Sequence, residues 1–204
     1  MTITALRRVS ADRVTVELAD HSEIKSSLGV VSDRRLFTGK ELDEEELAEL
    51  RRDSSRSLAR DQAIELISRR RMSRRELRER LLRRGVGEDA AEYSLQWLEE
   101  RGFLSDESYA AAVARHYAAK GYGAGRVRAE LSRRGVDRAL WDEAVEQMPE
   151  PDDKLDRFIA ARLRDPEDRE QLRKLSAALF RRGYSWEQIR AALRRHTDEI
   201  IEED

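Results

Sequence analysis

The chain has no cysteine among its 204 residues. That absence excludes disulfide bonds, thiol catalysis and zinc sites with cysteine ligands. Histidine is scarce as well: His21, His116 and His196 are scattered along the chain, and no two of them have the spacing of metal ligands. The sequence therefore predicts a protein that holds no metal ion.

Long apolar runs and aromatic residues are also lacking. No apolar stretch approaches the length of a membrane-spanning helix, and the first ten residues, MTITALRRVS, have no apolar signal-peptide core. We therefore expect a soluble, cytoplasmic protein. Aromatic residues make up 6% of the chain and charged residues 40%. This composition leaves little material for one deep core and favours thin helical layers.

The charge is abundant but nearly balanced, because 40 basic residues face 42 acidic ones for a formal net charge of −2. The molecule as a whole is therefore not a basic nucleic-acid binder. The basic residues comprise 35 arginines and only five lysines. A genomic composition bias and a selection for forked contacts to carboxylates or phosphates both account for this preference, and the sequence leaves the two open.

The first thirty residues alternate between apolar and polar side chains. Residues 13–19 do so strictly, and 3–9 and 24–30 flank them across short polar turns. We predict a small three-stranded antiparallel β-element. Such a sheet is marginal alone and needs a cover. The predicted cover is the helix that follows Leu42, whose acidic first turn, 43–46, suits the positive end of a helix dipole.

The rest of the chain has helical periodicity and repeats itself. Gly85, Gly135 and Gly183 are spaced by 50 and 48 residues, and each follows two arginines. The flanking apolar positions also recur: Leu77, Leu81 and Val86, then Val127, Leu131 and Val136, then Leu175, Leu179 and Tyr184. A left-handed glycine after a helix brings the residues four before and one after it into contact. We predict that each glycine ends a helix, and that Gly102 ends another.

The predicted fold is mainly α, with three tandem three-helix repeats in an elongated, curved array behind the β-element and its helix. Capping boxes are predicted at Ser73 and Ser185, and an N-cap at Asp165 before Pro166. The expected helices lie near 57–70, 74–84, 88–101, 106–119, 124–134, 138–147, 152–163, 167–182 and 185–197. The expected domains are 1–55 (β-meander plus helix), repeats at 56–104 and 105–150, and a third repeat at 151–204 with an acidic C-terminal tail.

Phosphate-loop motifs are incomplete. Residues 121–125, Gly-Tyr-Gly-Ala-Gly, have no preceding strand, and Lys40 is followed by Glu41 where a P-loop requires Ser or Thr. No carboxylate pair lies in an apolar pocket signature. The tryptophans Trp97, Trp141 and Trp186 are expected in the core. We therefore predict a non-enzyme with no catalytic residue and no cofactor.

The repeat resembles that of the RecX family of regulatory proteins. The likeness spans about 36–197 and rests on the order and spacing of its motifs. They are Gly39-Lys-Glu-Leu42, Ser73-Arg-Arg-Glu-Leu-Arg-Glu-Arg-Leu81 with Arg84-Gly-Val86, Leu98-Glu-Glu-Arg-Gly-Phe-Leu-Ser-Asp106 with Tyr109-Ala110, Lys120-Gly-Tyr-Gly123 with Arg126-Val-Arg128, and Phe180-Arg-Arg-Gly-Tyr184. Ala124 departs from the family, which often has proline there, and this weakens the expectation of a stiff turn.

The resemblance implies a partner, the RecA recombinase and its filament on single-stranded DNA, whose growth, ATP hydrolysis and strand exchange RecX proteins suppress. We expect a monomer that binds through exposed basic side chains. The candidates are Arg70, Arg71, Arg74, Arg75 and Arg78 in the first repeat, and Lys120, Tyr122, Arg126 and Arg128 in the second. The alternative is direct binding to nucleic acid, because residues 56–84 hold 11 arginines and four acids, a net charge of +7.

Overall fold

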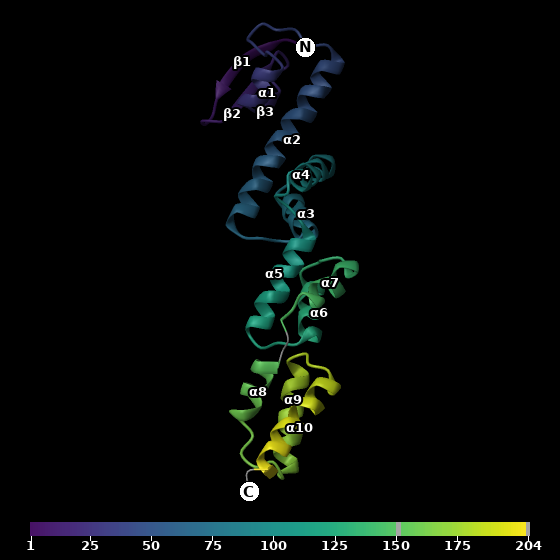
Figure 1. The fold of residues 1–204 in the computed structure, drawn as a ribbon. Helices are drawn as coiled ribbons and strands as arrows, with labels where there is room; N and C mark the ends of the chain where they lie inside the picture. The colour runs from purple at the N-terminus through teal and green to yellow at the C-terminus, as the bar shows by residue number, and fades with distance from the viewer. Residues whose placement is uncertain (150–151, 203–204) are drawn as a thin grey trace. The chain divides into compact units, whose positions relative to one another are not determined.

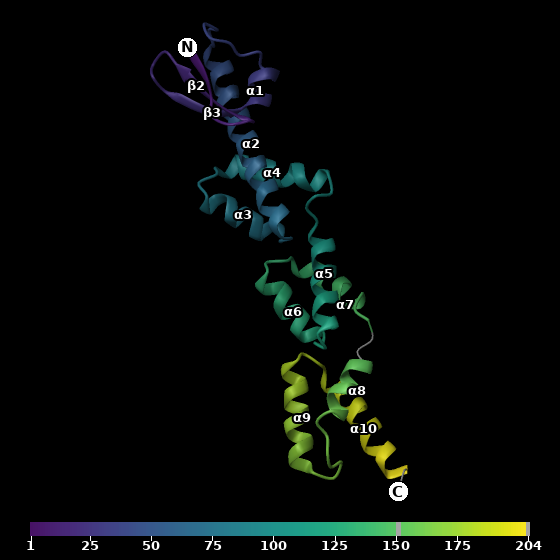
Figure 2. The same cartoon turned by 90° about the vertical axis from the view of Figure 1, so that its left-hand side faces the viewer.

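The computed structural model describes residues 1–149 and 152–202. The chain forms two compact units, Met1–Leu104 and Ser105–Asp204 (Figures 1 and 2). The predicted boundary between 150 and 151, and the last two residues of the acidic tail, lie outside the described residues.

The first unit begins with the expected antiparallel sheet. Its strands β1 (Ile3–Arg8), β2 (Arg13–Leu18) and β3 (Glu23–Ser27) pair in the order β1-β2-β3. The third strand is shorter than predicted. Ser27 accepts a hydrogen bond from the backbone N–H of Val30 and thereby starts the short helix α1 (Leu28–Asp33), so the expected strand character of 28–30 is wrong.

One continuous helix, α2 (Glu44–Arg69), occupies the place of the two helices expected after Leu42 and from residue 57. Asp43 and Glu46 form its capping box. Its first half packs on the sheet. There Ser54 Oγ donates to Ser26 Oγ and Ser57 Oγ donates to Ser27 Oγ, both at 2.8 Å between buried side chains. The expected division between 55 and 56 thus falls inside a helix.

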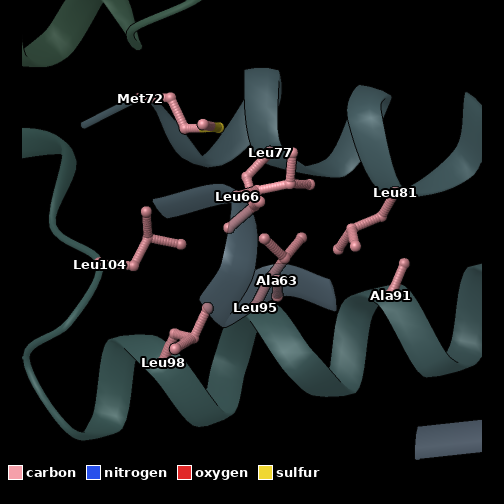
Figure 3. Close-up of a cluster of buried hydrophobic side chains, with 9 residues drawn as sticks. All are labelled: Ala63, Leu66, Met72, Leu77, Leu81, Ala91, Leu95, Leu98 and Leu104. Atoms are coloured by element: carbon pink, nitrogen blue, oxygen red, sulfur yellow. The ribbon is translucent and has the colours of Figure 1, made fainter. Parts of the chain in front are cut away.

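The second half of α2 completes the first three-helix repeat with α3 (Arg74–Arg83) and α4 (Glu88–Glu100). Figure 3 shows how the three helices and the following loop point their apolar side chains inward. The buried cluster is Ala63, Leu66, Met72, Leu77, Leu81, Ala91, Leu95, Leu98 and Leu104. Each Å² of apolar surface that is buried contributes about 25 cal/mol to stability. This cluster is therefore the main source of the repeat's stability.

The second unit holds the other two repeats (Figures 1 and 2). The second repeat comprises α5 (Asp106–Ala119), α6 (Ala124–Arg133) and a split third helix, a 3₁₀ turn at Arg138–Leu140 followed by α7 (Trp141–Glu146). The third comprises α8 (Asp152–Ala160), α9 (Arg169–Arg181) and α10 (Trp186–Glu202). Each repeat has its own buried cluster, one around Leu131 and the other around Leu179.

The helix caps bear out most of the sequence signals. Gly85, Gly135 and Gly183 have φ of +81°, +70° and +90°, and Gly102 has φ of +70°. The residue after each repeat glycine donates its N–H to the predicted leucine carbonyl, at 3.1 Å for Val86 to Leu81, 3.1 Å for Val136 to Leu131 and 3.3 Å for Tyr184 to Leu179. These are the predicted Schellman caps.

The start of α9 differs from the prediction. Its N-cap is Asp168, whose Oδ1 accepts from the N–H groups of Glu170 at 2.8 Å and Gln171 at 3.0 Å. Asp165 instead accepts from Glu167 N–H at 2.9 Å and closes a turn ahead of the helix. Both aspartates are good N-cap residues, and the hydrogen bonds assign the cap to the second.

Candidate functional site

The first-repeat arginines lie at the end of α2 and on α3, and most of them bind carboxylates. Arg70 pairs with Glu76, Arg75 with Glu79 at 3.0 Å, and Arg78 with Glu88 at 3.1 Å. Arg74 bridges to α4 through Glu92 and through Glu99, the latter at 2.8 Å. The positive charge counted along 56–84 is therefore partly offset by carboxylates of this unit.

The ionisation of these groups reflects the pairing. The hydrogen bond that Arg74 donates to Glu92 is the largest cause that raises the pKa of Arg74 above its usual value, against the opposing effect of burial. Burial by itself would raise the pKa of Glu76. The hydrogen bonds from Arg70 and Arg80 outweigh it and hold that pKa below its ordinary range. Through these two residues α3 is tied to α4 and to the end of α2.

Arg71 differs from the other four. Its side chain is exposed in the link between α2 and α3, and the described residues place no carboxylate within ion-pair distance of it. A guanidinium without an acidic neighbour keeps all of its donors for a partner. Within the predicted first-repeat set, Arg71 is therefore the side chain that no carboxylate of the described residues engages.

The second-repeat candidates surround the glycine link between α5 and α6. Lys120 is exposed at the C-terminus of α5, and Arg126 is exposed on the first turn of α6. Tyr122 is half-buried, with its ring centroid 5.6 Å from that of Tyr117. Arg128 pairs with Asp142 at 2.9 Å. This set belongs to the second unit, and the first-repeat arginines belong to the other.

The glycines of this link serve a purpose within the chain. They let the backbone of the second repeat come close to that of the third. Gly123 N–H donates to Arg182 O and Gly125 N–H to Gly183 O, both at 2.9 Å. A Cβ on Gly123 would lie 2.5 Å from Gly183 O, closer than real Cβ atoms come. Glycine is therefore required for packing between the two repeats.

Two basic residues that the sequence did not single out reinforce this junction. Arg182 donates to Gly121 O at 3.1 Å, and its guanidinium lies 4.4 Å from the ring centroid of Phe158. Lys154 Nζ donates to the carbonyl of Ala119 at 2.9 Å, at the C-terminal end of α5. The signal for Arg182 was present in the third Arg-Arg-Gly motif, but its partner is 61 residues away in the chain.

The tryptophans split between two environments. Trp97 and Trp141 are partly buried against their repeat cores, and Trp141 Nε1 donates to Val136 O at 3.1 Å. Trp186 is 52% exposed, so its predicted place in the core is wrong. Its ring stacks on Phe180, also 52% exposed, with centroids 5.0 Å apart. Phe180 of this pair lines a groove of about 460 Å³, whose other lining residues are Ala124, Gly125, Arg126, Arg128, Ala129, Arg181, Gly183, Tyr184, Ser185 and Gln188.

Residues 1–149 and 152–202 contain neither a metal-binding cluster nor a membrane-spanning helix. Their His, Asp and Glu side chains form no cluster of three that is arranged to hold a metal ion. No helix in this part of the chain is both long enough and apolar enough to cross a membrane.

Sequence models of the three RecX domains match the chain in order. The first three-helix domain of RecX matches residues 59–98, the second 105–145 and the third 159–193. Among solved structures, "Crystal structure of regulatory protein RecX" has a TM-score of 0.72 at 20% identity, covering 97% of this chain and 98% of that one. RecX from Lactobacillus salivarius has a TM-score of 0.62 at 20% identity, over 71% of this chain and 97% of that chain. These likenesses show the fold.

Curated relatives carry the likeness at higher identity. "Regulatory protein RecX" of Xanthomonas axonopodis pv. citri (strain 306) is 37% identical over 135 residues, which is 65% of this chain and 83% of the relative. "Regulatory protein RecX" of Vibrio vulnificus (strain CMCP6) is 32% identical over 137 residues, 65% of this chain and 89% of the relative. Three domain matches in order, together with these relatives, show that the chain belongs to the RecX family of regulatory proteins.

Proposed function

We propose that this protein binds the RecA recombinase and its filament on single-stranded DNA, and restrains filament growth, ATP hydrolysis and strand exchange. The observation that carries the proposal is the ordered match of all three RecX domains, together with relatives named regulatory proteins. Regulation through binding requires no catalytic group, and we propose that the protein acts as a cytoplasmic monomer, without enzymatic activity or a cofactor.

The proposed contact residues are basic side chains of the first two repeats, together with Tyr122. Arg71 and Arg126 support this assignment best, because both are exposed and the described residues hold neither in an ion pair. The guanidinium fork suits carboxylates of a protein partner and phosphates of its bound strand. The remaining members of the proposed set are Arg70, Arg74, Arg75, Arg78, Lys120, Tyr122 and Arg128.

Direct binding to nucleic acid is the second proposal, and the net charge of +7 on residues 56–84 favours it. The carboxylates of Glu88, Glu92 and Glu99 on α4 weaken it, because each pairs with an arginine of that segment. A salt titration separates the two functions. Tight DNA binding without RecA, with an affinity that falls steeply as salt rises, would favour direct binding.

The test of the main proposal is to add the purified protein to RecA on single-stranded DNA and to follow ATP hydrolysis and filament length. We expect both to fall with increasing dose. The protein alone should hydrolyse no ATP, before and after repurification. Unchanged RecA hydrolysis and filament length at saturating protein would refute the proposal.

A further inference from the structure

The groove between the second and third repeats has a lining unlike the rest of the surface. Its lining includes small residues of α6 and of the turn before α10, among them Gly125, Ala129 and Gly183. The backbones of Gly125 and Gly183 are joined by a hydrogen bond of 2.9 Å. This part of the lining therefore has small side chains, and a backbone hydrogen bond within one compact unit fixes its position.

The walls of the groove are cationic and aromatic. Arg126 and Arg128 stand on one side, and Phe180 and Arg181 on the other. No aspartate or glutamate is among the lining residues. Arg128 is held by Asp142 outside the groove, whereas the described residues place no carboxylate within ion-pair distance of Arg126 or Arg181. The two unpaired guanidiniums give the groove a local positive charge in a molecule whose net charge is −2.

The aromatic wall is exposed to solvent. Phe180 lines the groove and is backed by the stacked ring of Trp186, and each of them is 52% exposed. Exposed, stacked rings next to arginines are typical of a recognition surface, because the rings supply contact area with little loss of conformational freedom. The partner must therefore present both apolar and anionic groups.

We infer that this groove binds an acidic segment of a protein partner, with a large apolar side chain seated against Phe180 and flanking carboxylates paired to Arg126 and Arg181. A nucleic-acid strand fits less well. The groove is confined to residues 124–129 and 180–188, and it offers two unpaired arginines in place of the long basic track that a phosphate backbone follows. The inference shares Arg126 with the contact set proposed above, but it is argued from the lining of the groove and from Phe180 and Arg181, which lie outside that set.

The test uses the full chain and a fluorescein-labelled peptide of sequence EDLFEDLE, with fluorescence anisotropy as the readout. The peptide QNLFQNLQ, which keeps the apolar side chains and removes every charge, is the ligand control. A short labelled oligothymidylate is the nucleic-acid control. We expect saturable binding of the acidic peptide, and affinities at least about tenfold weaker for both controls, as the loss of one charge-assisted contact predicts.

The protein variants are chosen in matched pairs. Arg126→Gln with Arg181→Gln should weaken binding of the acidic peptide by about tenfold or more. Arg169→Gln with Arg173→Gln removes the same charge from exposed sites that do not line the groove and should leave binding unchanged. Phe180→Ala should weaken binding, and Phe103→Ala, at an exposed phenylalanine of the other unit, should not. Circular dichroism verifies that every variant is folded.

Four results would overturn the inference. They are the absence of saturable peptide binding, equal affinity for the neutral peptide, unchanged affinity in the folded Arg126/Arg181 variant, and tighter binding of oligothymidylate that is lost in the same variant. The last result would assign the groove to nucleic acid.

Discussion

Gly123 and Gly183 touch backbone to backbone, although they are 60 positions apart in the chain. A Cβ on Gly123 would lie 2.5 Å from the carbonyl oxygen of Gly183, and a Cβ on Gly183 would come closer still to the backbone nitrogen of Arg126. Neither obstacle is a flexible side chain. The contact therefore joins the second and third repeats through main-chain atoms, which a substitution cannot accommodate by a change of rotamer.

Gly123→Ala tests this contact directly. We expect the free energy of unfolding of the second unit to fall by about 1–3 kcal/mol, because overpacking forces the backbones apart. Gly87→Ala is the matched control, since Gly87 also precedes a helix but a methyl group added there would meet nothing within 4 Å. Urea titrations followed by circular dichroism measure both. An equal midpoint for wild type and Gly123→Ala would show that the contact carries no stability.

Gly135→Val tests the left-handed cap of the second repeat. With φ of +70°, Gly135 occupies a conformation that β-branched residues rarely adopt. We expect a loss of about 1–3 kcal/mol in stability, spreading to the third repeat through the glycine junction. Thermal denaturation measures the effect. Val136→Ile, a conservative change at the next residue, serves as the control, and an unaltered melting temperature in Gly135→Val would contradict the cap's contribution.

Glu130 tests a buried ionic cluster. Its side chain is only 3% exposed, and Arg133 and Arg134 bind it at 2.5 and 2.6 Å. The hydrogen bond from Arg133 is the largest cause that lowers the pKa of Glu130 to about 2; burial opposes it, and Arg134 adds to it. A depressed folded-state pKa contributes stability that is complete above the unfolded value, near 4.5, and is lost as the pH falls through about 2.

We therefore expect Glu130→Gln to lower the free energy of unfolding at pH 7 by about 1–3 kcal/mol, a range that allows for the exposure of Arg133. The difference from wild type should shrink as the pH falls from 4.5 toward 2. Urea unfolding at several pH values measures it. Glu146→Gln, at an exposed position of the same repeat, should change little at any pH. A difference that is independent of pH would exclude the ionic contribution.

The first-repeat arginines are tested together by Arg71→Ala with Arg74→Ala and Arg75→Ala. We expect the triple variant to remain folded, because exposed ion pairs contribute only about 0–1 kcal/mol each, and to inhibit RecA ATP hydrolysis less strongly. Each lost charge-assisted contact costs about 1–3 kcal/mol of binding if it is desolvated. Dose curves of inhibition, paired with circular dichroism, measure both effects.

Two single variants distinguish a residue that contacts the partner from one that stabilises the fold. Arg71→Ala should lose inhibition without losing stability, whereas Arg74→Ala should lose some stability because Arg74 bridges α3 to Glu92 and Glu99 of α4. A folded triple variant that inhibits at wild-type doses would move the interface elsewhere, to the third repeat around Arg181, Arg190 and Arg194.

The caps and the repeat could be predicted from the sequence because their determinants act within one or two helical turns. A glycine that ends a helix needs only its own backbone freedom and two apolar neighbours, as at Gly85 with Leu81 and Val86. Ser185 and Gln188 likewise form the predicted capping box, with N–H to side-chain distances of 3.0 and 3.1 Å. Alternation along 13–19 was enough for the central strand.

Tertiary contacts decided what local signals left open. The polar stretch around Ser54 and Ser57 stays helical because both hydroxyls find buried partners on β3, where an isolated segment would have no such compensation. In the sequence, the arginines around Arg74 form a basic segment. In the folded unit, carboxylates of α4 lie beside Arg74 and pair with it. Gly123 and Gly183 meet only once both repeats have folded, since contacts between distant residues depend on how whole helices pack and not on the propensity of any one turn.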